Sequence, residues 1–250
     1  MERLIMEKKP KSPISEAYRT IRTNIEFSSI DVEVRKMLIT SSGPGESKST
    51  TASNLAVAFA QSGKKTLLID GDLRKPTVFK FFNISNRMGL SNVIVDGVNI
   101  LNPSTAKIDG LGLDEVIHHY SDKLDVLTSG TIPPNPSEIV GSNKMRIFIE
   151  SMAKKYDRVI IDAPPVNAVT DAQLLSTMVD GVLFVVGSEI THIDGAKRAM
   201  ELLNHVNAKV LGVILTRVKK SNSKNGFNGY YNYYSNEDKK SENKKNRRNK

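Results

Sequence analysis

The chain has 250 residues, 39% of them hydrophobic, which is enough for one good-sized core, and it has no cysteine, which excludes disulfides, thiolate metal sites and cysteine catalysis. The formal net charge of +9 is concentrated at one end, because residues 219–250 carry ten Lys and Arg against three Asp and Glu. Residues 1–12 lack the apolar run of a signal peptide, and no apolar stretch is long enough to span a bilayer, so we expect a cytoplasmic protein.

The first predicted element is a helix over residues 13–27. It begins with a Ser-Pro pair, in which serine can cap the helix and proline suits the first helical position. Glu16, Arg19 and Arg22 share a broad face of this helix, which could pair with charged groups of a neighbouring subunit. A solvated face is the alternative interpretation.

A glycine-rich loop follows, between a predicted strand at 36–41 and a helix predicted over 48–62. This order is the context of a phosphate-binding loop, in which backbone N–H groups turn toward the phosphates and the helix start faces them. We expect the phosphates of ATP to be held by the residues of this loop, namely Gly43, Pro44, Gly45, Glu46, Ser47, Lys48, Ser49 and Thr50.

Two residues of the loop have specific expected roles, and one departs from the usual pattern. Lys48 can reach the β- and γ-phosphates, and the hydroxyl of Ser49 can bind Mg²⁺. The consensus has glycine directly before the lysine, where this chain has Ser47. A Cβ there could crowd the phosphate or force a φ angle that serine disfavours.

Carboxylates follow two further predicted strands. Asp70 and Asp72 lie at and just beyond the end of one strand, and Asp162 ends another. Carboxylates at strand ends lie beside the phosphate loop in this architecture and can hold Mg²⁺. Since Asp70 and Asp72 are two residues apart, one can serve the metal while the other accepts a proton from an attacking hydroxyl. Arg74 is either a residue that neutralises phosphate charge or a solvated turn residue.

Short apolar runs alternate with helical patterns along the whole body of the chain. This alternation predicts an α/β fold with a doubly wound, mostly parallel sheet. The remaining strands are predicted at 66–70, 124–128, 158–162, 181–186 and 210–215, and the remaining helices at 136–155, 172–178 and 194–206. We expect an N-terminal segment, 1–34, a P-loop NTPase domain, 35–218, and a tail, 219–250.

The tail is rich in Asn, Lys, Ser and Gly with almost no aliphatic residues, a composition that predicts disorder. It contains a cluster of tyrosines: Tyr230, Tyr231, Tyr233 and Tyr234. Phosphorylation would add roughly −1.5 to −2 charges to each and could offset the positive charge of the tail.

With these residues in place, the chain resembles the bacterial tyrosine kinases, in particular the stand-alone kinases of capsule and exopolysaccharide synthesis. The resemblance covers about residues 13–217. The segments around Lys48, Asp70 and Asp162 resemble the family's Walker A, A′ and B motifs, and 127–138 resembles a family segment that precedes a helix.

The resemblance extends to both ends of the chain. Glu16, Arg19 and Arg22 fit the family's E-x-x-R-x-x-R self-association motif, which implies a homo-oligomer. The tyrosine cluster resembles one that the family autophosphorylates in trans. The family also implies a membrane adaptor of the polysaccharide co-polymerase type, which would recruit the kinase to the inner face of the cell membrane.

Taken together, these features predict Mg·ATP-dependent transfer of the γ-phosphoryl group to tyrosine hydroxyls, on the tail and on other proteins. Lys48 would stabilise charge on the phosphates. Ser49, Asp72 and Asp162 would hold Mg²⁺, and Asp70 would accept the hydroxyl proton.

Two other functions compete with this interpretation. A partitioning or division ATPase of the same fold would carry a second lysine five positions before Lys48, where this chain has Gly43. A nucleic-acid-binding protein could use the lysines and tyrosines of the tail, but the charge is confined to a segment without predicted structure, so we do not expect nucleic acid as a partner. An anionic membrane surface is an accessory possibility for the same charge.

Overall fold

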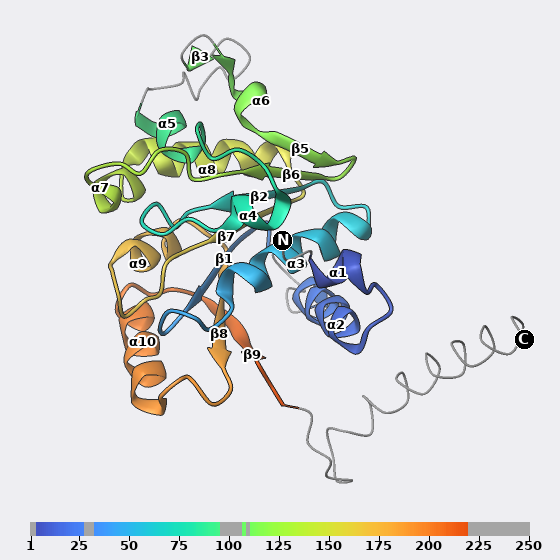
Figure 1. The fold of residues 1–250 in the computed structure, drawn as a ribbon. Helices are drawn as coiled ribbons and strands as arrows, with labels where there is room; N and C mark the ends of the chain where they lie inside the picture. The colour runs from blue at the N-terminus through green and yellow to red at the C-terminus, as the bar shows by residue number, and fades with distance from the viewer. Residues whose placement is uncertain (1–3, 28–32, 96–106, 109–110, 220–250) are drawn as a thin grey trace, which may run out of the picture.

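Seven strands form the central sheet, in the order β5-β6-β2-β7-β1-β8-β9 (Figure 1). The computed structural model describes residues 4–27, 33–95, 107–108 and 111–219. All neighbouring strands from β6 to β9 pair in parallel, and β5 pairs with β6 antiparallel. The strands are β1 (Lys36–Ser41), β2 (Thr66–Asp70), β5 (His118–Ser121), β6 (Leu124–Leu127), β7 (Arg158–Asp162), β8 (Gly181–Gly187) and β9 (Val210–Thr216). The predicted doubly wound, mostly parallel α/β fold is confirmed.

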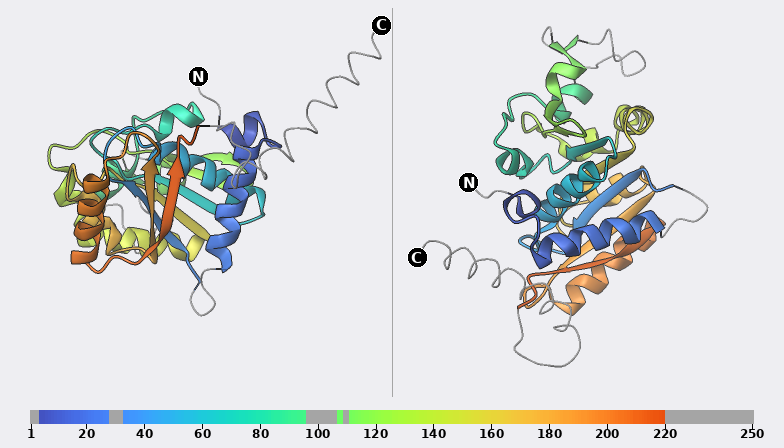
Figure 2. Two further views of the ribbon diagram at one scale, coloured as in Figure 1. Left: turned by 90° about the horizontal axis from the view of Figure 1, so that it is seen from below. Right: turned by 90° about the vertical axis from the view of Figure 1, so that its right-hand side faces the viewer.

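Helices cover both faces of this sheet (Figures 1 and 2). One face carries α1 (Ile5–Lys8), α2 (Pro13–Phe27), α3 (Lys48–Gln61) and α4 (Val78–Phe82). The other carries α5 (Leu90–Val95), α7 (Pro136–Val140), α8 (Asn143–Lys155), α9 (Asp171–Ser176) and α10 (Ile193–His205). The inner strands are therefore buried on both sides, which explains their unbroken apolar sequences.

Successive residues of each strand contribute to two separate cores. Met37 and Ile39 of β1 pack toward the face of α3, while Leu38 between them packs on the opposite face. The side-chain alternation of an extended strand produces this division. Helix α3 is the most enclosed helix, with Ala52, Leu55 and most of its other residues buried.

Some elements differ from the sequence prediction. The helix predicted over 136–155 is two helices, because Gly141 and Ser142 interrupt it and the hydroxyl of Ser142 accepts a hydrogen bond from the backbone N–H of Met145, 3.1 Å away, which caps α8. Strand β5, with the polar sequence His-His-Tyr-Ser, was not predicted. The other elements that the prediction missed are short: α1, α4, α5, α6 (Leu113–Val116), β3 (Lys107–Ile108) and β4 (Leu111–Gly112).

The strand order brings three strand ends together at one edge of the sheet. Strand β7 lies between β1 and β2, and Asp70 pairs in register with Asp162. The loop after β1 leads directly into α3 at the same edge. The carboxyl ends of parallel strands at such a place form the usual ligand site of a doubly wound sheet.

Candidate functional site

The glycine-rich loop connects the end of β1 to the first residue of α3, Lys48. Gly45 has a φ of 80°, in the region that glycine occupies at little cost, and a Cβ there would have no atom within 4 Å. Ser47 has a φ of 71° and a ψ of 25°, which is left-handed. The departure from the glycine consensus therefore does force serine into a conformation that it disfavours.

Buried Glu46 anchors the loop from behind. Its carboxylate accepts hydrogen bonds from the backbone N–H and the hydroxyl of Ser42, at 2.9 and 2.6 Å, and from the hydroxyl of Thr191 at 2.7 Å. The hydroxyl of Thr216, at the end of β9, donates to the backbone carbonyl of Glu46 at 2.9 Å. The side chain of Glu46 thus faces into the protein and fixes the shape of the loop, while phosphate binding by the backbone of this predicted loop residue stays a prediction.

Lys48 lies between carboxylates from two strand ends. Its ammonium nitrogen is 3.0 Å from Oδ2 of Asp72, 3.7 Å from Oδ1 of Asp162 and 3.3 Å from the hydroxyl of Ser49. Burial alone would lower the pKa of Lys48, but the charges of Asp162 and Asp72 outweigh it, so the pKa is raised and the lysine is charged. Lys48, Asp72, Asp162 and Ser49, which come from distant parts of the sequence, thus form one cluster.

Asp70 lies in the same cluster but is fully buried and held by backbone groups. Its Oδ2 accepts from the backbone N–H of Thr77 at 3.1 Å and of Val78 at 3.0 Å, and its Oδ1 accepts from the N–H of Asp72 at 3.3 Å. Burial, and then the charge of Asp162, raise the pKa of Asp70 to about 8. A carboxyl group with that pKa can hold or release a proton near neutral pH.

The cluster fits a magnesium ion. Asp162 is completely buried, and neither of its carboxylate oxygens has a partner within hydrogen-bond distance, the ammonium of Lys48 being 3.7 Å from Oδ1, so the carboxylate is incompletely compensated for its burial. Burial raises the pKa of Asp162, and a bound cation would reverse that effect. Carboxylate and hydroxyl oxygens from Asp162, Asp72 and Ser49 are the ligands that Mg²⁺ prefers, with water and phosphate oxygens completing its shell.

Arg74 is partly exposed but is paired within the protein, so it is not simply a solvated turn residue, and its neutralisation of phosphate charge stays a prediction. Its guanidinium donates to the buried carboxylate of Asp171, at 2.9 Å from Nε and 3.2 Å from Nη2, and to the hydroxyl of Ser137 at 2.7 Å. Ser137 itself donates to Asp171 at 2.7 Å. The loop after β2 is thereby joined to α7 and α9. No sequence signal identified Asp171 or Ser137 for this role.

The charged residues of α2 pair within the chain. Arg19 forms an ion pair with Glu16 and donates to the carbonyl of Pro10 at 2.8 Å. Arg22 is less exposed and donates to the carbonyl of Ala58, near the end of α3, at 3.1 Å. Arg22 therefore also attaches α2 to the helix that begins at the phosphate loop. The four tail tyrosines lie outside the described residues.

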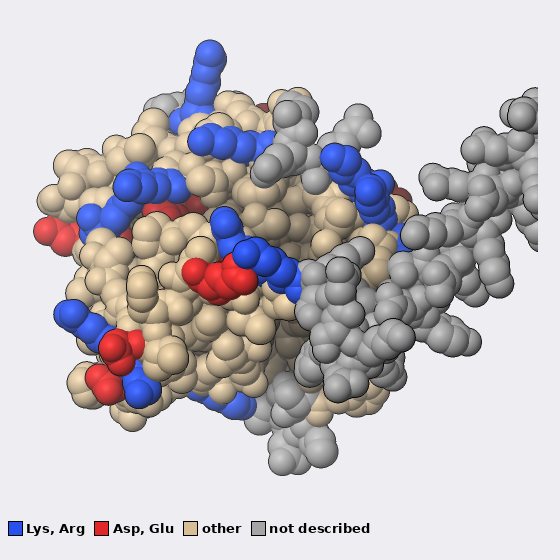
Figure 3. All heavy atoms as spheres, turned by 60° about the horizontal axis from the view of Figure 1, so that its bottom comes forward, with Lys and Arg blue, Asp and Glu red and all other residues tan. Residues whose placement is uncertain are grey.

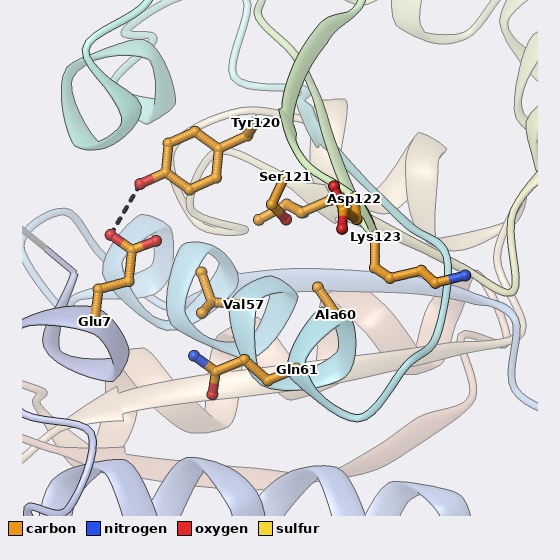
Figure 4. A pocket seen from close by; sticks show the side chains of 9 residues that line it. Glu7, Val57, Ala60, Gln61, Tyr120, Ser121, Asp122 and Lys123 are labelled. Atoms are coloured by element: carbon orange, nitrogen blue, oxygen red, sulfur yellow. Dashed lines mark hydrogen bonds between the residues drawn. The ribbon is translucent and has the colours of Figure 1, made fainter.

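A cavity of about 400 Å³ lies at the opposite end of the strands, near the start of β6 (Figure 4). Helices α1 and α3 and the β5–β6 turn line it, and the hydroxyl of Tyr120 donates to Glu7 at 2.8 Å across its rim. The cavity is remote from the phosphate loop and none of the predicted site residues lines it. Lys and Arg are dispersed over the face drawn in Figure 3 and do not form a continuous basic stripe on it.

Comparisons with known proteins identify the family of the chain. Residues 37–239 match the family model described as the CobQ/CobB/MinD/ParA nucleotide binding domain. The chain is 46% identical to the tyrosine-protein kinase YwqD of Bacillus subtilis (strain 168) over 213 residues, which are 85% of this chain and 84% of that protein. It is 40% identical to the putative tyrosine-protein kinase CapB of Staphylococcus aureus over 215 residues, 86% of this chain and 89% of that protein.

A solved structure shows the same similarity. The chimerical protein CapA2B2 superimposes with a TM-score of 0.77 at 47% identity, covering 87% of this chain and 90% of that one. Within the residues that the structure describes, no helix combines the length and the apolar character needed to cross a lipid bilayer.

Proposed function

Because the chain belongs to the bacterial tyrosine kinases, within the CobQ/CobB/MinD/ParA nucleotide-binding family, we propose that it transfers the γ-phosphoryl group of Mg·ATP to tyrosine hydroxyls. The observation that carries this proposal is the position of Lys48 between Asp72 and Asp162, at the end of a phosphate loop that opens α3. A cation, oxygen ligands for magnesium and backbone N–H groups are the parts that phosphoryl transfer requires.

The chemical step needs little covalent participation by the protein. The tyrosine oxygen forms a bond to the γ-phosphorus, the bond to the β–γ bridging oxygen breaks, and ADP leaves. Asp70 accepts the proton of the tyrosine hydroxyl, for which its raised pKa is suited. Lys48 stabilises the charge that develops on the phosphate oxygens.

Ser49, Asp72 and Asp162 would hold the magnesium ion, which would neutralise phosphate charge. The buried oxygens of Asp162, which have no partner within hydrogen-bond distance, support this assignment. Lys48, which contacts both carboxylates, would turn toward the phosphates as their charge enters the site.

The first substrates in this proposal are tyrosines of a neighbouring copy: Tyr230, Tyr231, Tyr233 and Tyr234. These tyrosines follow a polar, basic stretch of the sequence, and such a composition suits their presentation to the site of another subunit. Self-association through Glu16, Arg19 and Arg22 would bring the copies together, and the partly exposed Glu16–Arg19 pair supports this role better than Arg22 does.

The wider role that we propose is regulation of capsular or exopolysaccharide synthesis at the inner face of the cell membrane. A membrane adaptor of the polysaccharide co-polymerase type would recruit and activate the kinase there. The resemblance of the chain to stand-alone kinases of such systems supports this part of the proposal.

Phosphotyrosine measurement on the purified protein with ATP and Mg²⁺ tests the central claim. Lys48→Met should abolish incorporation, because the phosphates lose their cation, while Lys123→Met, a change at the remote β5–β6 turn, should leave it intact. Undiminished phosphotyrosine in the Lys48→Met protein would remove the phosphate loop from the mechanism.

A further inference from the structure

Two residues with left-handed backbone conformations contact each other at the phosphate loop. Ser47, in the loop, has a φ of 71°, and Arg217, directly after β9, has a φ of 57°. Nε of Arg217 donates a hydrogen bond to Oγ of Ser47 at 3.3 Å. Residues with a Cβ seldom adopt this region, because the Cβ approaches the backbone too closely. The contact therefore joins two of the five non-glycine residues that have a positive φ in the described part of the chain.

The residues directly before this pair make a second contact between the same two segments. The hydroxyl of Thr216 donates to the carbonyl of Glu46 at 2.9 Å. Consecutive residues at the end of β9 thus hold consecutive residues of the phosphate loop. Position 47 has a left-handed backbone conformation, which glycine adopts freely and serine does not. The contacts from Thr216 and Arg217 can stabilise the loop in this conformation.

Arg217 has no competing partner in the described part of the chain. No carboxylate there forms an ion pair with it, and Glu189, on the loop after β8, pairs instead with Lys219, at 2.6 Å. The arginine is exposed, so its contribution to the core is small. Its hydrogen bond to Ser47 is the contact through which it can affect the loop.

We propose that Arg217 is a positioning residue for nucleotide binding, which acts by holding the side chain of Ser47 and so keeps the phosphate loop in its binding conformation. The inference rests on the proposed function in one respect, the binding of Mg·ATP. In this chain, the hydrogen-bonded pair of Arg217 and Ser47 would take the role that glycine at position 47 has in the consensus loop.

A double-mutant cycle on the affinity for Mg·ATP, measured by calorimetry, tests this pair. Arg217→Met should weaken binding roughly three- to tenfold in the Ser47 protein, the effect of one lost hydrogen bond. In a Ser47→Gly background, the same arginine change should alter the affinity less than about twofold, because the contact no longer exists. Lys219→Met is the matched control, since it removes another exposed positive charge two residues away and should change the affinity little.

Melting temperatures of all variants separate folding from binding, and we expect Arg217→Met to melt within about 2 °C of the parent, as is usual for an exposed side chain. An equal loss of affinity in both backgrounds would show that Arg217 acts on the nucleotide directly and would overturn the inference. No loss in the Ser47 background would overturn it as well. If the parent protein bound no Mg·ATP, the proposed function itself would fail.

Discussion

The ammonium nitrogen of Lys48 lies 3.0 Å from Oδ2 of Asp72, so the cation of the phosphate loop and one proposed magnesium ligand are hydrogen-bonded to each other. In the proposed function, Asp72 would therefore have two opposing effects on ATP. It occupies Lys48 and repels phosphate, yet it would hold the ion that accompanies the phosphate.

Asp72→Asn should separate these effects. ATP in EDTA should bind the variant more tightly, by roughly fivefold or ~1 kcal/mol, because one negative charge is removed. Addition of magnesium should improve binding less than it does in the parent protein. Calorimetry with and without magnesium measures both affinities, with Asp122→Asn at the remote turn as the control. An unchanged magnesium effect in the variant would argue against Asp72 as a ligand.

Ser47→Gly should stabilise the fold, because glycine adopts a φ of 71° without the cost that serine has there. We expect a gain of about 0.5–1 kcal/mol in the free energy of unfolding, after the larger backbone entropy of unfolded glycine is included. Urea unfolding measures this gain. Asn83→Gly is the control, since Asn83 has a φ of 54° but asparagine tolerates that region, and its change should be smaller. A destabilised Ser47→Gly protein would contradict the prediction.

The raised pKa of Asp70, about 8, predicts a specific dependence of stability on pH. Between about pH 4 and pH 8 the folded protein keeps a proton that the unfolded chain has released. The contribution to stability is therefore complete at the low end of this window and is lost as the pH rises through 8. Asp70→Asn should flatten this slope.

Urea unfolding in EDTA at pH 5.5 and pH 8.5 measures the slope. The lower pH of 5.5 avoids the titration of Glu33. The hydrogen bond from Arg158 lowers the pKa of Glu33, so this carboxyl group binds its proton only at more acidic pH. Asp122→Asn should keep the parental slope. The same slope in the Asp70→Asn protein would show that another group binds the proton.

The Arg74–Asp171 pair predicts a rescue experiment. Arg74→Met leaves the buried carboxylate of Asp171 without its cation and should cost about 2 kcal/mol, less than a fully buried pair because Arg74 is partly exposed. The double variant Arg74→Met with Asp171→Asn should recover most of this loss, as measured by urea unfolding. Arg146→Met is the control, because Arg146 is an exposed arginine on α8. Additive losses would contradict a direct pair.

Phosphorylation in trans can be tested with two complementary proteins. One carries Lys48→Met and keeps its tyrosines, and the other carries phenylalanine in place of the four tail tyrosines: Tyr230, Tyr231, Tyr233 and Tyr234. When they are mixed with Mg·ATP, mass spectrometry should find phosphate on the tail of the Lys48→Met protein, which alone should stay unmodified. Phosphate on neither protein, with the unaltered chain active, would mean that each copy modifies only itself.

The sequence predicted the parts of the fold that depend on local pattern. Buried parallel strands such as β1 and β7 are unbroken apolar runs, so their positions were confirmed within a residue or two. Strand β5 has no such pattern, because it is a polar edge strand that forms by pairing with β6. The break between α7 and α8 depends on a cap that a helical periodicity does not reveal.

The same distinction applies to the site. The phosphate loop and Asp70, Asp72 and Asp162 could be located because each follows a recognisable strand. The partner of Arg74 could not, since Asp171 lies 97 residues further along the chain and only the fold brings the two together. The inward orientation of Glu46 likewise depends on Thr191, on a loop 145 residues away.

The enclosure of helix α3 has a consequence for how the protein can move and change. Residues from Thr51 to Phe59 are buried on every side, between the sheet and helices α1, α2 and α4. A helix without a free face cannot slide or tilt unless close packing is lost all around it. In the proposed kinase, exchange of ADP for ATP would then proceed by opening of the loops around this helix. Those loops, rather than α3, are also where the chain could accept larger side chains and insertions during evolution.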